Sequence, residues 1–267
     1  MKVSGKVIAV TGGGSGIGRA LVLELLKRNA KVAAIDLNEK ALNETKLLAN
    51  DQNNNLSLHV ANITDISRVN QLPDEIIKYH QKLDGLINNA GIIQPFIKVL
   101  DIELEKINQV FNVNFYGTLY MIKVFSPYLL KRSEAHILNI SSMGGFLPVP
   151  GQTIYGASKA AVKLLTEGLY SEFSDTSIKM TVVFPGGVRT NISNELGIDL
   201  KKMEEMGKGR KVMSPEEAAR IIIDGMEKDK YQIFVGSDAK IMNFLYKRFP
   251  RYANNLITKQ MKKLVSK

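Results

Sequence analysis

The stretch VIAVTGGGSGIG (7–18) decides the fold. Val7 to Val10 form a short apolar run of the kind that becomes a buried strand, and the glycines after it let the chain turn sharply. Apolar residues then recur at helical spacing from Ile17 to Leu26, and Asn29 closes the pattern. The stretch therefore predicts a strand, a glycine-rich turn and a helix, in that order.

The glycine turn predicts a phosphate-binding site. Gly12, Gly16 and Gly18 would bring the backbone close to a pyrophosphate. The N-terminus of the following helix would hold that group through its free amides and its dipole. A glycine-rich turn alone is a weak signal, but its place between a strand and a helix strengthens it.

The same alternation continues along the chain. Nearly continuous apolar strands separated by helices predict a parallel sheet covered on both faces, with right-handed crossovers. The expected fold class is therefore α/β, a doubly wound Rossmann-type sheet of about seven strands in the order 3-2-1-4-5-6-7. Further strands are expected at 31–36, 56–60, 84–91, 136–142, 178–187 and 231–236, and helices at 39–50, 65–81, 102–130, from YGASK (155–159) to 173, and from 214 to 226.

Length and composition exclude several classes of protein. The 267 residues suit one domain (1–267), and no repeat or linker divides them. The chain has no cysteine and only three scattered histidines, so neither a disulfide framework nor a metal site is expected. The first residues lack the pattern of a secretory signal and no run is long enough to span a membrane, so we expect a cytoplasmic protein. The polar excursion at 191–213 is expected to form a substrate lid.

The net charge of +10 is concentrated near the C-terminus. Eight basic residues and no acidic ones lie from Lys240 to Lys267, among aromatic and aliphatic residues. This basic amphipathic extension (240–267), broken at Pro250, admits three interpretations: a lid or subunit contact, peripheral attachment to anionic lipid, or a solvated end. Specific nucleic-acid binding is not expected, because no recognition motif accompanies the charge.

Asp36 ends the second expected strand. An acid at this place can accept hydrogen bonds from the ribose hydroxyls of adenosine, whereas a 2′-phosphate would meet a like charge. Neither position 15 nor position 37 carries a lysine or arginine to compensate. NAD is therefore favoured over NADP, with a helix-capping aspartate as the alternative.

Tyr155 and Lys159 lie four residues apart in YGASK (155–159). On a helix these positions share a face about one turn apart, although such a pair is common on ordinary amphipathic helices. An ammonium ~6 Å from the phenol, at an effective dielectric constant of ~20, favours the phenolate by about 3 kcal/mol. That would lower the pKa of the tyrosine from about 10 to about 8.

Several motifs together resemble the short-chain dehydrogenase/reductase family, in its compact single-domain branch. They are TGGGSGIG (11–18), NNAG (88–91), Asn114, Ser142, YGASK (155–159) and PGGVRT (185–190). The resemblance reaches from the start of the chain to about Gly236, and it implies an oxidoreductase that uses a nicotinamide dinucleotide. It also suggests dimers or tetramers packed through the helices at 102–130 and 155–173.

The resemblance implies four catalytic positions. Tyr155 would transfer the proton at the substrate oxygen, Ser142 would hydrogen-bond that oxygen, and Lys159 would lower the pKa of Tyr155 and hold the nicotinamide ribose. Asn114 would anchor a water chain to Lys159. Ser141 is the neighbouring alternative to Ser142, but Ser142 has the spacing of the family, 13 positions before Tyr155. Ser142 could also merely end a strand, and Asn114 could be a buried polar residue.

The resemblance also implies a set of cofactor contacts. Asn89 and Ala90 would flank the adenosine ribose, Asn62 and Ile63 would contact the adenine, and Val188 and Thr190 would hold the nicotinamide end. Asn62 stands where the family usually has aspartate, which could weaken the adenine contact. The whole expected set is Gly12, Gly14, Ser15, Gly16, Ile17, Gly18, Asp36, Leu37, Asn62, Ile63, Asn89, Ala90, Gly91, Tyr155, Lys159, Pro185, Val188 and Thr190.

Apolar residues surround the expected catalytic positions. Met143, Phe146, Leu147 and Val149 follow Ser142, and Ile92, Ile93 and Pro95 follow NNAG (88–91). We therefore expect a lipophilic secondary alcohol or ketone, such as a steroid, a retinoid or an acyl-chain compound, with plain loop packing as the alternative. A function of another class, a dinucleotide-binding sensor or scaffold that docks through its basic extension, would not need Ser142.

Overall fold

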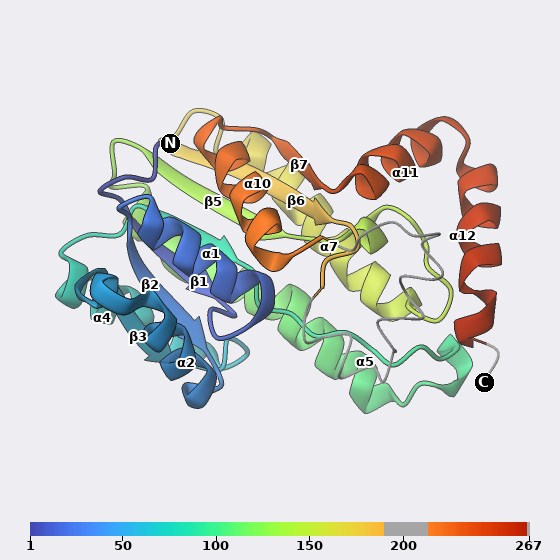
Figure 1. The fold of residues 1–267 in the computed structure, drawn as a ribbon, viewed down its shortest axis with the longest axis horizontal. Coiled ribbons are helices and arrows are strands. Elements are labelled where there is room, and N and C mark those ends of the chain that lie inside the picture. The colour runs from blue at the N-terminus through green and yellow to red at the C-terminus, as the bar shows by residue number, and fades with distance from the viewer. Residues whose placement is uncertain (190–212, 266–267) are drawn as a thin grey trace.

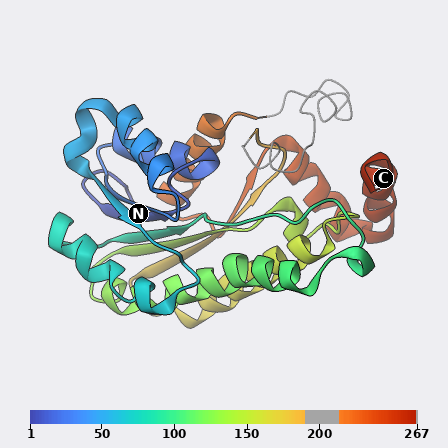
Figure 2. The same ribbon diagram turned by 90° about the horizontal axis from the view of Figure 1, so that it is seen from below.

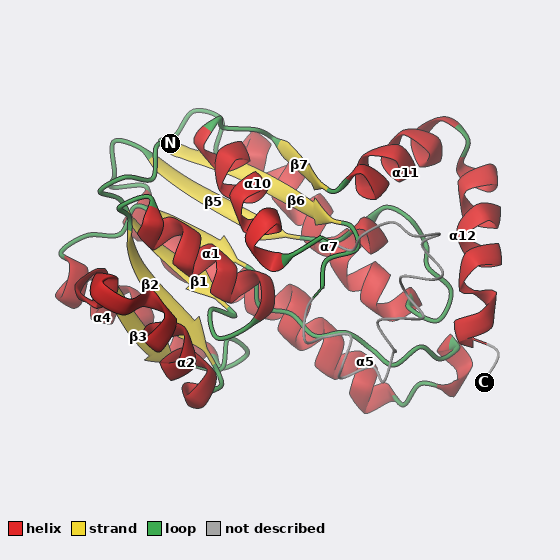
Figure 3. Ribbon diagram, viewed as in Figure 1, coloured by secondary structure: helices red, strands yellow, loops and turns green. Residues whose placement is uncertain are grey.

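The computed structural model of the chain describes residues 1–189 and 213–265. Seven parallel strands form one sheet in the order β3-β2-β1-β4-β5-β6-β7, as expected from the sequence. Figures 1 and 3 show the sheet at the centre of the molecule. The strands are β1 Val7–Thr11, β2 Lys31–Asp36, β3 Leu56–Val60, β4 Gly85–Asn88, β5 Ala135–Ile140, β6 Ile178–Pro185 and β7 Gln232–Val235.

Helices cover both faces of the sheet (Figure 2). The α-helices are α1 Gly16–Lys27, α2 Glu39–Ala49, α3 Ile66–Val69, α4 Leu72–His80, α5 Leu104–Phe111, α6 Thr118–Leu129, α7 Thr153–Glu172, α10 Pro215–Glu227, α11 Ser237–Arg248 and α12 Pro250–Val265. The shorter turns are the 3-10 segments η1 Asn50–Asn55, η2 Val99–Asp101 and η4 Met143–Gly145, and the π-helical segment η3 Asn112–Gly117.

The alternation of side chains along β1 explains the two layers. Ile8 and Val10 pack in a core with α1, α2 and α10, whereas Val7 and Ala9 pack in a second core with α4, α6 and α7. Successive residues of a strand face opposite sides of the sheet, so a strand buried on both sides must be apolar throughout. This is why VIAV (7–10) contains no polar residue.

Three expected elements differ in detail. The expected helix over 65–81 is divided into α3 and α4, with Pro73 in the first turn of α4, where the missing N–H is tolerated. The expected helix over 102–130 is interrupted by η3. The interruption does not lie at Pro127, which is inside α6. The expected strand at 84–91 ends at Asn88, because the next amide groups bond to a side chain of β1.

The edge strand β3 is joined to α4 by a polar cluster. The Ser57 hydroxyl lies 2.8 Å from His59 Nε2 and 2.9 Å from His80 Nε2, and His59 Nδ1 lies 3.1 Å from Glu75 Oε2. Arg68 holds Glu75 through two hydrogen bonds of 2.7 and 2.9 Å. Burial lowers the pKa of His80 to about 4, so the ring is neutral at physiological pH.

The last two helices fold back onto the body of the molecule. Leu147 is fully buried in a third apolar cluster with Ala253 and Ile257 of α12, so part of the C-terminal extension has a packed place in the fold. Asp238, in the first turn of α11, accepts a hydrogen bond of 2.8 Å from the Gly187 amide. No described helix has the length and apolar character needed to cross a membrane.

Candidate active site

The glycine turn and the start of α1 form one end of the candidate site. Gly12 and Gly16 have φ angles of 68° and 51°, in the left-handed region that favours glycine. A Cβ atom on Gly18 would overlap the Gly12 carbonyl oxygen, so only glycine permits this close turn. Ser15 makes no side-chain cap to α1, and the first turn has no acidic residue. The amides at this helix end suit an anionic ligand.

Asp36 lies beside this turn, at the end of β2. Its Oδ2 atom accepts a hydrogen bond of 2.9 Å from the Gly14 amide, and its Oδ1 atom accepts one of 3.0 Å from the Asn38 amide. Each carboxylate oxygen can accept further bonds, so two anchoring contacts leave room for ribose hydroxyls. The helix cap of α2 is Asn38, whose side chain accepts from the Ala41 amide. Asp36 therefore does not cap α2, the alternative considered for it.

Thr11 fixes the loop after β4 against the end of β1. Its hydroxyl accepts hydrogen bonds of 3.0 Å from the amides of both Asn89 and Ala90, while the Asn89 side chain donates to the Thr11 carbonyl at 3.1 Å. Sequence reasoning missed Thr11. The available signal was a hydroxyl directly after an apolar strand, at the edge where ligands bind parallel sheets.

Tyr155 and Lys159 lie in the first two turns of α7 and border the same cavity. The Lys159 Nζ atom donates a hydrogen bond of 2.9 Å to the Ile140 carbonyl, and the residue is 4% exposed. Burial lowers the pKa of this amine to about 8.

Burial raises the pKa of the Tyr155 phenol, and a hydrogen bond with Ser142 opposes that shift only in part. The expectation that the pKa of Tyr155 falls to about 8 is therefore wrong for this structure. Removal of water from the phenolate is the largest cause of the shift, and the neighbouring ammonium donates its hydrogen bond to Ile140. The phenol holds its proton near neutral pH.

The adjacent serines differ in their partners. The Ser141 hydroxyl donates a hydrogen bond of 2.7 Å to the Lys159 carbonyl and thus joins the end of β5 to α7. The Ser142 hydroxyl accepts from the Gly144 amide at 3.0 Å and contacts Tyr155. Of the two serines, Ser142 is thus the one that contacts Tyr155, and its catalytic role stays a prediction.

Asn114 is fully buried in the π-helical segment η3. Its amide oxygen accepts from the Ile92 amide at 2.8 Å, and its amide nitrogen donates to the Ile92 carbonyl and to Ser158 Oγ at 3.0 and 2.9 Å. A Cβ atom on Gly91 would lie 3.1 Å from both Asn114 Oδ1 and Lys159 Nζ. Asn114 thus holds the loop that passes beside the lysine. Single π turns inside helices are frequent at functional sites.

Gln94 was not recognised in the sequence, yet it holds the start of α7. Its side chain accepts a hydrogen bond of 2.8 Å from the Tyr155 amide and donates one of 3.0 Å to the Gly151 carbonyl. Its own carbonyl accepts one of 2.9 Å from Gln152 Nε2. The available signal was a single polar residue within the apolar run IIQPFI (92–97).

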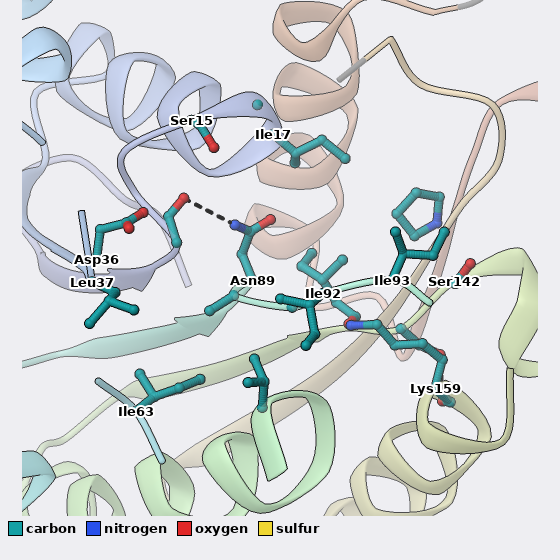
Figure 4. Close-up of a pocket in the computed structure, with 18 of the residues that line it drawn as sticks. Ser15, Ile17, Asp36, Leu37, Ile63, Asn89, Ile92, Ile93, Ser142 and Lys159 are labelled. Carbon is teal, nitrogen blue, oxygen red and sulfur yellow. Dashed lines mark hydrogen bonds between the residues drawn. The ribbon is translucent and has the colours of Figure 1, made fainter. Parts of the chain in front are cut away.

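These elements enclose a cavity of about 540 Å³. Figure 4 shows Asp36 and Leu37 on one side of it, Ser142 and Lys159 on the other, and Asn89 and Ile92 between them. The expected residues that line the cavity are Gly12, Ser15, Gly16, Ile17, Asp36, Leu37, Asn62, Ile63, Asn89, Ala90, Gly91, Ser142, Tyr155, Lys159, Pro185 and Val188.

Three expected residues do not line the cavity: Gly14, Gly18 and Asn114. Thr190 and nearly all of the expected lid (191–213) lie outside the described residues. Among the residues that the structure describes, no group of three or more His, Cys, Asp or Glu side chains could hold a metal ion.

The apolar segment after Ser142 serves mainly in packing. Phe146 contacts the rings of Phe184 and Phe234, and Leu147 is covered by α12. Of the apolar residues expected to border the substrate, only Ile92 and Ile93 line the described cavity. Plain loop packing, the alternative considered from the sequence, therefore accounts for much of 143–149.

A family model described as short chain dehydrogenase matches residues 6–201. The chain belongs to the short-chain dehydrogenase/reductase family. It is 34% identical over 248 residues to the putative oxidoreductase SadH of Mycobacterium tuberculosis, covering 90% of each chain. It is 31% identical over 227 residues to the 3-oxoacyl-(acyl-carrier-protein) reductase FabG of Thermotoga maritima, covering 84% of this chain and 91% of that protein.

Solved structures of other proteins share the fold. A short-chain dehydrogenase/reductase from Burkholderia phymatum in complex with NAD has a TM-score of 0.82 at 23% identity, over 93% of this chain and 96% of that chain. ElxO with NADP bound has a TM-score of 0.76 at 28% identity, over 86% of this chain and 97% of that chain. The similar proteins thus include complexes with either dinucleotide.

Proposed function

We propose that this protein is an NAD(H)-dependent oxidoreductase that exchanges a hydride between the nicotinamide and a secondary alcohol or ketone. One observation carries the proposal: Ser142, Tyr155 and Lys159 border the same cavity as the glycine turn and Asp36. The backbone amides that would bind a pyrophosphate and the Tyr155 phenol that would transfer a proton therefore border one cavity. A bound nicotinamide would supply or accept the hydride.

In this proposal the side chains of the chain divide the remaining work. The Tyr155 phenol, whose pKa is raised by burial, holds the proton that a substrate carbonyl takes up on reduction. Ser142 orients the same oxygen, and the Lys159 ammonium, fixed on the Ile140 carbonyl, adds positive charge beside it. Asn114 fixes the loop at Ile92 through two hydrogen bonds.

Nicotinamide absorbance during oxidation of a panel of secondary alcohols tests the assignment. Tyr155→Phe removes the proton carrier and keeps the ring, so kcat should fall at least about a hundredfold. Tyr170→Phe, a change at a half-exposed position of the same helix, should leave kcat unchanged. Equal activity of the wild type and Tyr155→Phe would overturn the assignment and favour a binding protein.

We propose NAD as the cofactor because Asp36 borders the cavity beside the first turn of α1. Asp36→Asn keeps the shape and removes the charge, so NADP⁺ should bind about tenfold more tightly and NAD⁺ more weakly. Glu39→Gln, a nearby exposed change of the same charge, should alter neither dissociation constant. Tighter binding of NADP⁺ than NAD⁺ by the wild type would reject the choice of NAD.

We propose an uncharged, lipophilic substrate because Ile92, Ile93 and Val188 line the cavity, while its described lining contains one cation, Lys159. That cation is the lysine proposed to act beside the substrate oxygen, and the described lining contains no second cation for a substrate carboxylate. Values of kcat/KM should rank decanol-like and steroid alcohols above sugar alcohols. A preference for the sugars would reject this class.

We propose a homodimer or homotetramer packed through α5 to α7. Large apolar side chains are exposed on these helices, namely Leu104 and Tyr116 before α6 and Leu164 and Tyr170 on α7. Exposed apolar patches of this kind commonly mark protein contacts. The cytoplasmic location expected from the sequence stays a prediction.

A further inference from the structure

The outer face of α11 and the turn into α12 combines apolar and cationic side chains. Ile241, Phe244, Phe249 and Tyr252 are 47, 68, 52 and 61% exposed. Lys240, Lys247, Arg248 and Arg251 are exposed beside them, and the Arg248 guanidinium lies 5.6 Å from the centre of the Phe249 ring. We call these eight residues the basic aromatic face.

The fold does not need these apolar side chains. On the opposite face of α11, Ala239 is fully buried. The same face carries Met242, Leu245 and Tyr246, which pack on the cluster around Leu147. One face of the helix is thus sufficient to hold it in place. Exposed aromatic residues on the second face cost solubility without adding to the core, which points to a contact with something else.

The positive charge of the basic aromatic face restricts the kind of partner that can bind it. Asp238 is the only acidic residue from Ser237 to Lys267, and its carboxylate accepts the Gly187 amide. A second copy meeting this face symmetrically would oppose like charges. The rest of the chain carries only a small share of the net charge of +10 and offers no excess of acid to attract the face. The complementary partner is therefore anionic and apolar together.

We propose that the basic aromatic face docks the protein on the surface of a membrane that contains anionic phospholipid. Aromatic and aliphatic side chains would enter the boundary between headgroups and acyl chains, while the lysines and arginines contact phosphates. Ile241, Phe244 and Arg248 have the i, i+3, i+7 spacing of one helical face. Figures 1 and 2 place α11 and α12 at one end of the molecule, away from β3 and α4.

Co-sedimentation of the full-length protein with vesicles tests the proposal independently of the reaction. Binding is expected to vesicles of phosphatidylcholine with phosphatidylglycerol, to be much weaker with phosphatidylcholine alone, and to fall as salt is raised. Lys247→Glu/Arg248→Glu should reduce the partition coefficient at least about tenfold. Ile241→Ser/Phe244→Ser should also reduce it about tenfold, because both groups would leave the interface.

Matched variants on α2 provide controls. Lys40→Glu/Lys46→Glu changes the charge equally, and Leu47→Ser/Leu48→Ser removes apolar side chains that are 76 and 55% exposed. Both double variants should bind vesicles as the wild type does. Absence of binding, equal binding to neutral vesicles, or equal losses in the controls would overturn the proposal. If the wild type does not bind vesicles and forms a dimer that Ile241→Ser/Phe244→Ser cannot form, the basic aromatic face contacts a second copy of the chain instead.

Discussion

Ser141 and Ser142 are neighbouring serines at the end of β5, but their hydroxyls have different partners. The hydroxyl of Ser141 bonds the backbone of α7, whereas that of Ser142 contacts Tyr155. Ser142→Ala should therefore lower kcat, and its effect on stability should be smaller than that of Ser141→Ala, because the bond from the Gly144 amide that it loses is only partly buried. Ser141→Ala should lower the free energy of unfolding by about 1 kcal/mol, because a buried hydrogen bond is lost.

Enzyme kinetics and urea unfolding of the two serine variants separate these effects. The pair is its own matched control, since both substitutions remove one hydroxyl from neighbouring residues. The opposite result, with kcat sensitive to Ser141 and stability sensitive to Ser142, would contradict the assignment.

At the residue scale, spacing predicted which side chains share the cavity but not their energetics. Gly12, Asp36, Asn89 and Lys159 all line it, because motifs at strand ends must meet at one edge of a parallel sheet. The pKa of Tyr155 could not be predicted from spacing, since it depends on how completely water is removed from the phenol.

Gln94 links two elements, the loop after β4 and the start of α7. Gln94→Ala removes the acceptor of the Tyr155 amide and the donor to Gly151. We expect kcat to fall about tenfold while the dissociation constant of NAD⁺ stays unchanged, because the glycine turn and Asp36 are distant in the cavity wall. Gln94→Glu, which keeps the acceptor, should restore part of kcat.

Steady-state kinetics and cofactor titration of both Gln94 variants measure this. A merely structural role would change stability alone. Equal kcat in Gln94→Ala and the wild type would therefore show that Gln94 does not position Tyr155.

The cluster that joins β3 to α4 makes stability depend on pH. The pKa of His80 falls from 6.5 to about 4 on folding, so the unfolded chain binds the proton more readily between these values. Its contribution is fully present above about pH 6.5 and is lost as the pH falls towards about 4. Between pH 7.5 and 5.0 the loss should be about 2 kcal/mol.

Urea unfolding at these two pH values, with His80→Gln as the comparison, checks the prediction. The variant should lose about 2 kcal/mol less than the wild type over the same interval. His59, whose pKa is also lowered by burial, is present in both proteins, and its charge is one of the causes that lower the pKa of His80. Identical pH dependence of the two proteins would contradict the role of His80.

At the element scale, strand positions were predicted well and helix interruptions were not. Apolar runs mark buried strands directly, as VIAV (7–10) does for β1. The π-helical segment at Asn114 leaves no periodic signal, and the partners of the Asn114 side chain, Ile92 and Ser158, are distant in sequence. Pro73 is typical of the first turn of a helix and could have indicated the start of α4. The pattern of 65–81 instead predicted one continuous helix.

The whole molecule presents an apolar surface on the helices that we propose for assembly. Leu164 is 69% exposed on α7, so a charged residue there should not disturb the core. It should oppose association, because both copies would carry the same charge at the interface. Leu164→Glu should shift the protein to monomers, as measured by sedimentation velocity. Leu47→Glu, on α2, is the matched control and should not change the oligomeric state. A wild type that is itself monomeric would contradict the proposed interface.

At the scale of the whole molecule, the sheet order followed from the sequence because right-handed crossovers leave few arrangements for alternating strands and helices. The location of the C-terminal extension did not. Its contact with Leu147 joins residues about a hundred positions apart, and such a pairing carries no local signal. That the chain forms one domain stays a prediction.

The burial of Leu147 under α12 also imposes an order on biosynthesis. A ribosome adds about 5 to 20 residues per second from the N-terminus, so Leu147 is made several seconds before the helix that covers it. The glycine turn and Asp36 are also made before the loop beside Ser142 gains its cover. Translation that stops short of Ala253 should yield a protein in which Leu147 lacks its cover, so we expect it to be less stable, although it loses no residue that lines the described cavity.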